Sequence, residues 1–135
     1  VRIPDQVKVG PVTYRIVLAP NDEMKKLNGS EDEDVYLLGY HLAPDQAILI
    51  NEEQGPDMIR VTLVHELMHA VWEMMCLPSD PQLQESCVSS LSVGLVDLLR
   101  DNPKLVDVIM DGVGLRRTST KGSKETERGS KAART

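Results

Sequence analysis

Two histidines and a glutamate stand in this chain at a spacing that suits metal chemistry. His65 and His69 are four residues apart, and Glu66 directly follows the first histidine, which gives the pattern H-E-x-x-H. On an α-helix, side chains four residues apart lie on one face about 6 Å from each other, so both imidazoles can face one ion. The pattern is typical of zinc sites, and it predicts zinc as the cofactor with His65 and His69 as ligands.

Glu66 suits a different role from the two histidines. It lies about 100° further round the helix than His65, on the side of the ion where a water molecule would sit. Zinc makes such a water acidic, and Glu66 can take its proton as the water attacks a carbonyl carbon. The pattern therefore predicts Glu66 as the general base of peptide-bond hydrolysis.

A catalytic zinc site normally has three protein ligands, so a third one is needed. The metzincin class, which requires Gly and His at fixed distances after the second histidine, is excluded because Trp72 and Met75 occupy those positions. Glu85 is the best candidate, near the start of a following helix that would fold back against the first. A carboxylate on the edge of an apolar face is costly unless it is paired or bound to metal. Capping of its own helix is the alternative role for Glu85.

Other possible ligands fit less well. Cys76 lies on the same helical stripe as the histidines, but it is about 10 Å further along the axis and cannot share their ion. Cys87 points about 200° away from Glu85. We expect both cysteines, and Trp72, to be core residues. His41 lies in a predicted strand, where it either lines the cleft or is a packed or surface histidine.

Strands that would support the motif are predicted in the first part of the chain. β-prone runs cover residues 7–9 and 12–18 around the turn signal Gly10-Pro11, and residues 35–42 and 46–51 suggest a hairpin. Residues 21–34 are polar and are predicted to be a connection.

Helices are predicted in the second part. Pro56 suits the first turn of the helix that carries the motif, and this helix is expected to continue to Leu77. Asp80-Pro81 caps a second helix at about residues 82–100. A last short helix is expected at residues 105–110.

Charge separates the chain into two parts. Residues 1–115 carry 8 basic and 19 acidic side chains, a net charge of −11, which argues against nucleic-acid binding by the folded domain. Residues 116–135 carry 7 basic and 2 acidic side chains, a net charge of +5, and no apolar side chain larger than alanine. We predict a domain at residues 1–115 and a basic disordered tail at residues 116–135.

Cysteine content and hydrophobicity indicate the compartment. Two cysteines outside a C-x-x-C pattern predict neither a disulfide scaffold nor a cysteine zinc site. No apolar run approaches 18 residues, and the first residues lack the core of a signal peptide. We expect a soluble protein of a reducing compartment, without membrane contact.

The chain resembles a known group of proteins over residues 35–103. The resemblance rests on TLVHELMHA at residues 62–70, on Glu85, and on GLVDLLRDNP at residues 94–103. These features are similar to those of small phage and prophage zincin-like metallopeptidases related to the ImmA/IrrE family, which have a gluzincin arrangement. The segment LLRDNP is more specific to the phage group than H-E-x-x-H, because many families share H-E-x-x-H.

The resemblance implies an α+β fold, a minimal zincin-like domain in which a small, mostly antiparallel sheet packs on the metal-binding helix and on the Glu-bearing helix. It implies that His65, His69 and Glu85 bind zinc, with Glu66 as the base, in the cytoplasm of a bacterial host cell. An edge strand around residues 47–51 would receive an extended peptide by strand addition. The candidate substrate-binding residues are Ala47, Ile48, Leu49 and Ile50 of that strand, together with Tyr40 and His41.

One expected element is missing from the sequence. Many gluzincins have a downstream Tyr or His that stabilises the oxyanion, but no Tyr or His follows His69 here. Tyr40, His41 or an arginine near position 116 are the alternatives. The predicted function is a zinc-dependent metallopeptidase acting on a peptide or protein substrate. The alternative is a phage regulatory module that binds a protein partner and has a structural zinc.

Overall fold

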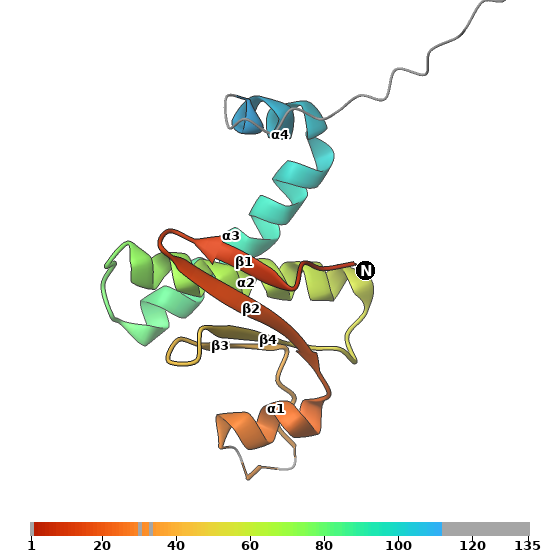
Figure 1. Ribbon diagram of the computed structural model, residues 1–135, viewed down its shortest axis with the longest axis vertical. Helices are drawn as coiled ribbons and strands as arrows, with labels where there is room; N and C mark the ends of the chain where they lie inside the picture. Colours follow the sequence, from red (N-terminus) through yellow and green to blue (C-terminus); the bar gives the residue numbers. More distant parts are fainter. Residues whose placement is uncertain (1, 30, 33, 112–135) are drawn as a thin grey trace, which may run out of the picture. The chain divides into compact units, whose positions relative to one another are not determined.

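The computed structural model describes residues 2–29, 31–32 and 34–111 (Figure 1). The chain divides into two compact units, residues 1–103 and 104–135. In its described part the first unit contains a four-stranded sheet and helices α1, α2 and α3, which confirms the predicted α+β class. Helix α4 (Pro103–Met110) lies at the predicted position of the last short helix, and all its residues after Pro103 belong to the second unit. The predicted tail, residues 116–135, lies outside the described residues.

The sheet is mixed. Its order is β1-β2-β4-β3, with antiparallel pairing in the two hairpins β1–β2 and β3–β4 and parallel pairing between β2 and β4. The hairpin predicted from residues 35–42 and 46–51 is confirmed for β3 and β4, and the turn predicted at Gly10-Pro11 joins β1 and β2, with a positive φ of 57° at Gly10. The strands are β1 (Gln6–Val9), β2 (Val12–Ala19), β3 (Gly39–Leu42) and β4 (Ala47–Asn51).

The prediction that residues 47–51 form an edge strand is wrong. Strand β4 lies between β2 and β3 and is paired on both sides, and all five of its residues are buried. Its apolar run faces two layers: Ile48 and Ile50 pack with α2 side chains on one face, and Ala47 and Leu49 pack with Met24 of α1 on the other. A strand covered on both faces needs apolar side chains at every position. The edge strands of the described sheet are instead β1 and β3, and β3 is the one that lies against Thr62 and Glu66 of helix α2.

The polar connection predicted at residues 21–34 contains a helix, α1 (Asn21–Asn28). Asp22 and Glu23 in its first turn and two lysines in its last turn suit the helix dipole. The helix ends at Gly29, whose φ of 69° forms a left-handed cap. The sequence signal was weak because Met24 is the single buried side chain of this short helix.

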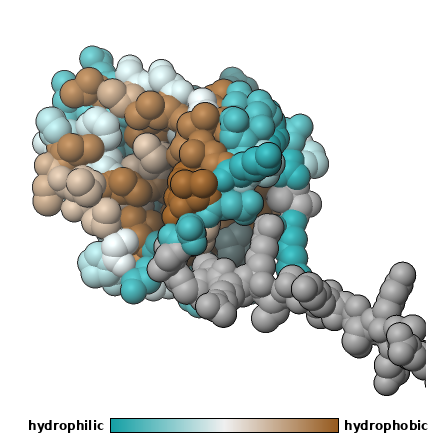
Figure 2. Space-filling model, turned by 90° about the horizontal axis from the view of Figure 1, so that it is seen from above, coloured by the Kyte–Doolittle hydropathy of each residue, from teal (hydrophilic) through white to brown (hydrophobic). Residues whose placement is uncertain are grey.

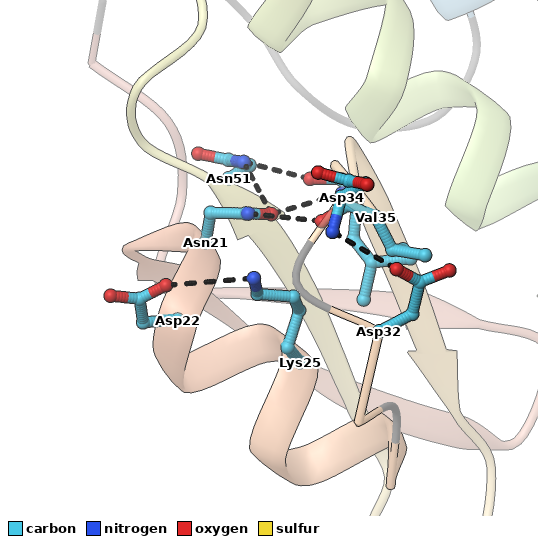
Figure 3. Close-up of polar contacts among 8 residues, drawn as sticks. Asn21, Asp22, Lys25, Asp32, Asp34, Val35 and Asn51 are labelled. Atoms are coloured by element: carbon cyan, nitrogen blue, oxygen red, sulfur yellow. Dashed lines mark hydrogen bonds and ion pairs between the residues drawn. The ribbon is translucent and has the colours of Figure 1, made fainter.

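The first part of the strand predicted at residues 35–42 is held by side chains instead of by strand pairing (Figure 3). The Asn21 side chain donates to the Val35 carbonyl oxygen at 3.2 Å and accepts from the Leu37 N–H at 3.0 Å. The buried Asn51 amide donates to the Leu37 carbonyl oxygen at 2.8 Å. These bonds fix the path of the chain just before β3 begins at Gly39.

Helix α2 (Pro56–Met74) begins where Pro56 predicted and ends three residues earlier than expected. Cys76 adopts a positive φ of 51°, and the Leu77 N–H returns to the Trp72 carbonyl oxygen at 3.3 Å. Together with the bond from the Cys76 N–H to the Glu73 carbonyl oxygen, this is a Schellman motif. Cys76 is exposed, so its predicted place in the core is wrong.

Helix α3 (Pro81–Asp101) begins at the predicted cap. The Asp80 carboxylate accepts from the N–H groups of Gln82 and Leu83 at 2.9 and 3.1 Å. The connection from α2 is short, so α3 folds back beside α2.

In the view of Figure 2, hydrophobic residues gather over one broad area of the surface next to a hydrophilic one. None of the helices in the described ranges has both the length and the apolar character needed to cross a membrane.

Candidate metal centre

The two histidines of the motif converge on one point beside helix α2. The Nε2 atoms of His65 and His69 are 3.1 Å apart, and the two ring centroids are 4.8 Å apart. Both side chains are partly buried, with 21% and 18% of their surface exposed. The helical spacing explains the arrangement, because residues four apart lie on the same face of α2.

Glu85 of α3 completes a group of three. Its Oε1 atom is 3.5 Å from His65 Nε2, and its Oε2 atom is 3.4 Å from His69 Nε2. The Ser89 hydroxyl, one turn further along α3, donates to Oε1 at 2.8 Å and orients the carboxylate. The structure thus brings together the three residues that the sequence predicted as ligands, and we refer to His65, His69 and Glu85 as the metal group. Within the described ranges, no other group of His, Cys, Asp and Glu side chains is arranged so that it could hold a metal ion.

The distances in this group fit a tetrahedral zinc ion. Zinc bonds to His nitrogen and carboxylate oxygen are about 2.0–2.2 Å long, so two ligand atoms at a tetrahedral angle lie about 3.3 Å apart. The three separations of 3.1, 3.4 and 3.5 Å are close to this value. Two imidazoles and a carboxylate are also a ligand set that zinc takes in catalytic sites, and they leave a fourth position open.

The surroundings of His69 favour its neutral form, which is the form that binds a metal. Burial lowers the pKa of His69 and the neighbouring His65 ring lowers it further, although the Glu85 carboxylate acts in the opposite direction. A metal binds the neutral imidazole, so a lowered pKa keeps His69 ready to bind at neutral pH.

Glu66 lies beside the metal group and is 6% exposed. Burial raises the pKa of its carboxyl to about 8, and the Glu85 carboxylate adds to the increase. A nearby cation stabilises the carboxylate form and shifts the pKa back down. Glu66 is therefore a group whose proton affinity depends on whether the neighbouring site holds a cation.

Gly39 of β3, which sequence reasoning missed, determines how closely the strand approaches Glu66. A Cβ atom at position 39 would lie 2.5 Å from Glu66 Oε1, 2.7 Å from Glu66 Cγ and 2.7 Å from Thr62 Cγ2. Gln54 holds the same region together, because it donates to the Leu38 carbonyl oxygen at 2.7 Å and accepts from the Thr62 hydroxyl at 2.8 Å. No pattern in the sequence signals this contact, which depends on the packing of a strand against a distant helix.

The predicted substrate-binding residues divide into two sets. Tyr40 and His41 of β3 line a cleft of about 670 Å³ that also contains the metal group. The residues Ala47, Ile48, Leu49 and Ile50 do not line it, because they are buried in the central strand β4. The cleft is bounded by residues 36–41, α2 and α3, and its lining includes Met58, Val61, Glu73, Gln84 and Val93.

His41 is packed and not a surface residue. Its side chain is 7% exposed, its ring lies 5.2 Å from that of Tyr14, and its Nδ1 atom is 3.7 Å from Oε1 of Glu73. Its buried Nε2 atom has no hydrogen-bond partner in the part of the chain that the structure describes. Burial lowers the pKa of His41, which the Glu73 carboxylate opposes.

The rivals for the metal lie outside the group. Cys87 is partly buried, and Cys76 is exposed and lies just after α2 ends. Trp72 is also partly buried rather than a core residue, and its indole N–H donates to the Pro78 carbonyl oxygen at 2.9 Å, which closes the loop between α2 and α3. The arginine considered near position 116 lies outside the described residues.

The free edge of β3 presents a defined set of backbone groups. The Asn51 N–H donates to the Leu38 carbonyl oxygen at 2.9 Å, so these two residues form a hydrogen-bonded pair. Such pairs alternate along an antiparallel ladder, and the next residue, Gly39, is paired with Ile50 without hydrogen bonds. The N–H and C=O groups of Gly39 and His41 therefore point away from β4, toward the free edge beside the cleft.

Comparisons of this chain with models of protein families, with curated proteins and with solved structures found no match in any of the three. The assignment of a function therefore depends on the geometry of the site.

Proposed function

We propose that this protein is a zinc-dependent peptidase of the gluzincin type. The observation that carries the proposal is the triangle of His65, His69 and Glu85, whose ligand atoms have tetrahedral spacing and lie in an open cleft next to a buried carboxylate. Zinc bound by these residues would supply Lewis acidity and lower the pKa of a water molecule to about 7. The resemblance to zincin-like phage peptidases supports the same function.

Glu66 is the residue that moves protons in this proposal. Its carboxylate accepts a proton from the attacking water and then donates it to the amine that leaves. Glu66 is 6% exposed, and this burial strengthens its interaction with the reacting groups. The separation of roles is clear, because the other glutamate, Glu85, has its oxygens directed at the two histidines.

Strand β3 is the element that binds the substrate backbone. An extended peptide that pairs with its free edge would form hydrogen bonds with the outward N–H and C=O groups of Gly39 and His41. Gly39 lies against Glu66, so a peptide bond held at this position is next to the proposed base. This replaces β4, the strand that the sequence suggested, with β3.

The test uses three variants. We expect Glu66→Gln to retain zinc and to lower the rate of peptide hydrolysis by about 10²- to 10⁴-fold, since it removes a general base. His69→Ala and Glu85→Ala should lose zinc. Metal analysis of the purified protein and a peptide-cleavage assay measure these outcomes, and a Glu66→Gln variant with full activity would exclude the mechanism.

A protein-binding module with a structural zinc is the second candidate. The observation in its favour is that the described residues after His69 include no Tyr or His for the oxyanion. The free edge of β3 and the cleft would then hold a partner without cleaving it. The Glu66→Gln variant separates the two candidates, because the binding module keeps its full biological effect when this residue changes.

A further inference from the structure

The cleft changes in character from one end to the other, first of all along helix α2. Met58 and Val61 line it before the metal ligands, and Glu73 lines it after them. Glu73 is one turn beyond His69, about 6 Å along the helix axis. One end of this wall is therefore apolar and the other carries a carboxylate.

The wall formed by residues 36–41 changes in the same direction. Tyr36 and Leu38, which are 51% and 42% exposed, precede Gly39, and His41 follows it. Gly39 lies against Thr62 and Glu66, whereas His41 lies against Glu73, seven residues later on α2. Strand β3 therefore advances along the cleft in the same direction as α2, with its apolar side chains first.

Helix α3 forms the third wall and runs the opposite way. Gln84 is next to the ligand Glu85, and Val93 is two turns further on, about 12 Å along the axis. Because α3 folds back from the end of α2, Gln84 lies toward Glu73 and Val93 lies toward Met58. All three walls thus have an apolar end and a polar end, and these ends coincide.

The polar end carries negative charge. Among the described residues, those that line the cleft include no lysine or arginine, and the one ion pair of Glu73 is with His41 Nδ1 at 3.7 Å. This distance is longer than a hydrogen bond. The Glu73 side chain is 52% exposed, so its carboxylate can accept hydrogen bonds from a ligand.

We propose that the cleft selects extended peptides with a lysine or arginine one or two residues before the scissile bond and an apolar residue directly after it. The basic side chain pairs with Glu73, and the apolar side chain lies among Tyr36, Leu38, Met58, Val61 and Val93. The direction follows from antiparallel pairing with β3, which is the more stable arrangement per residue. Cleavage of the bound peptide rests on the proposed peptidase function. The preferred order of a basic and an apolar residue along the bound peptide does not depend on that function.

The first experiment measures binding without cleavage. Zinc-loaded Glu66→Gln protein is titrated into two fluorescent peptides of equal composition, one with a lysine before an apolar residue and one in the reverse order. We expect the first peptide to bind about two- to five-fold more tightly, as for one solvent-exposed ion pair, and the difference to shrink at high salt. Peptides that bind equally in both orders would contradict the proposal.

Two further variants assign the preference to Glu73. Introduced together with Glu66→Gln, the change Glu73→Lys should shift the preference to a peptide with an acidic residue at the same position. Glu52→Gln, an exposed acid that does not line the cleft, is the matched control and should leave the preference unchanged. A preference that persists in the Glu73→Lys variant would show that another residue causes it.

The second experiment uses the wild-type protein and identifies cleavage sites in a peptide library by mass spectrometry. Lysine and arginine should be enriched one or two positions before the cleaved bond, and this enrichment should disappear in Glu73→Gln. Cleavage with no such enrichment would overturn the inference. Binding in the expected order with no cleavage at all would instead leave the inference standing and exclude the peptidase function.

Discussion

The side chain of Glu66 lies over the Cα atom of Gly39, where a side chain on the strand would otherwise be. The added methyl group of Gly39→Ala would come within 2.5 Å of Glu66 Oε1. We expect this variant to displace the carboxylate, to lose about 1–3 kcal/mol of stability from overpacking, and to lower activity while zinc stays bound. Denaturant unfolding, metal analysis and a peptide-cleavage assay measure the three effects.

A double-mutant cycle distinguishes this contact from a general defect of the strand. Gly39→Ala should cost clearly less stability in a Glu66→Ala background, where the clashing Cγ and carboxyl atoms are gone. In a Glu66→Gln background the cost should remain, because glutamine has the same shape. Equal costs in the two backgrounds would mean that Gly39 does not act through Glu66.

The pKa of Glu66 predicts how the stability of the metal-free protein depends on pH. The folded state raises this pKa to about 8, so it binds a proton more tightly than the unfolded chain does. Stability from this group is present below about pH 4.5 and is lost as the pH rises through about 8. Unfolding of wild type and Glu66→Gln at several pH values should show a decline in wild type that is absent from the variant.

The residues of the metal group could be predicted, and those that support it could not. The spacing of His65 and His69 fixes their geometry as soon as the segment is helical, and Glu85 follows from the short connection between two helices. The contacts of Gly39 with Glu66 and of His41 with Glu73 depend on which strand lies beside α2. A single sequence holds no local pattern for that contact.

At the scale of elements, the end of α2 has a residue in a conformation that suits glycine. Cys76 has a φ of 51°, which costs about 1 kcal/mol for a residue with a Cβ atom. We expect Cys76→Gly to raise stability by about 0.5–1 kcal/mol in denaturant unfolding. Met75→Gly is the control, since Met75 has an ordinary φ of −81° and should lose stability. A loss in both variants would contradict this account of the cap.

The boundaries of most elements could be predicted because prolines and caps mark them in the sequence. Pro56 and Asp80-Pro81 begin α2 and α3, and Gly10 marks the first hairpin. The order of the strands could not be predicted, since the parallel pairing of β2 with β4 passes over α1 and the whole of β3. That order decides which strand is at the edge, and the sequence-based choice of residues 47–51 was wrong for this reason.

At the scale of the whole molecule, zinc bound between α2 and α3 would stabilise the folded state through its ligands. A metal that binds only the folded protein adds about 2.7 kcal/mol at a free concentration 100 times its dissociation constant. We expect zinc to raise the Tm of the wild-type protein and a chelator to lower it. Glu85→Ala should abolish the shift, and Glu73→Gln, outside the metal group, should retain it. A shift that survives Glu85→Ala would place the bound metal elsewhere.

The free edge of β3 has a consequence for the conformation of the proteins on which such a peptidase would act. Only Gly39 and His41 in that strand present outward backbone groups, so a bound segment must be extended over the residues that pair with both of them. A helix or a tight turn satisfies its own backbone groups and cannot do this. Susceptibility of a target would then be governed by the free energy needed to open the segment locally. A stable domain would resist cleavage, whereas the same sequence in an unfolded chain would be cut.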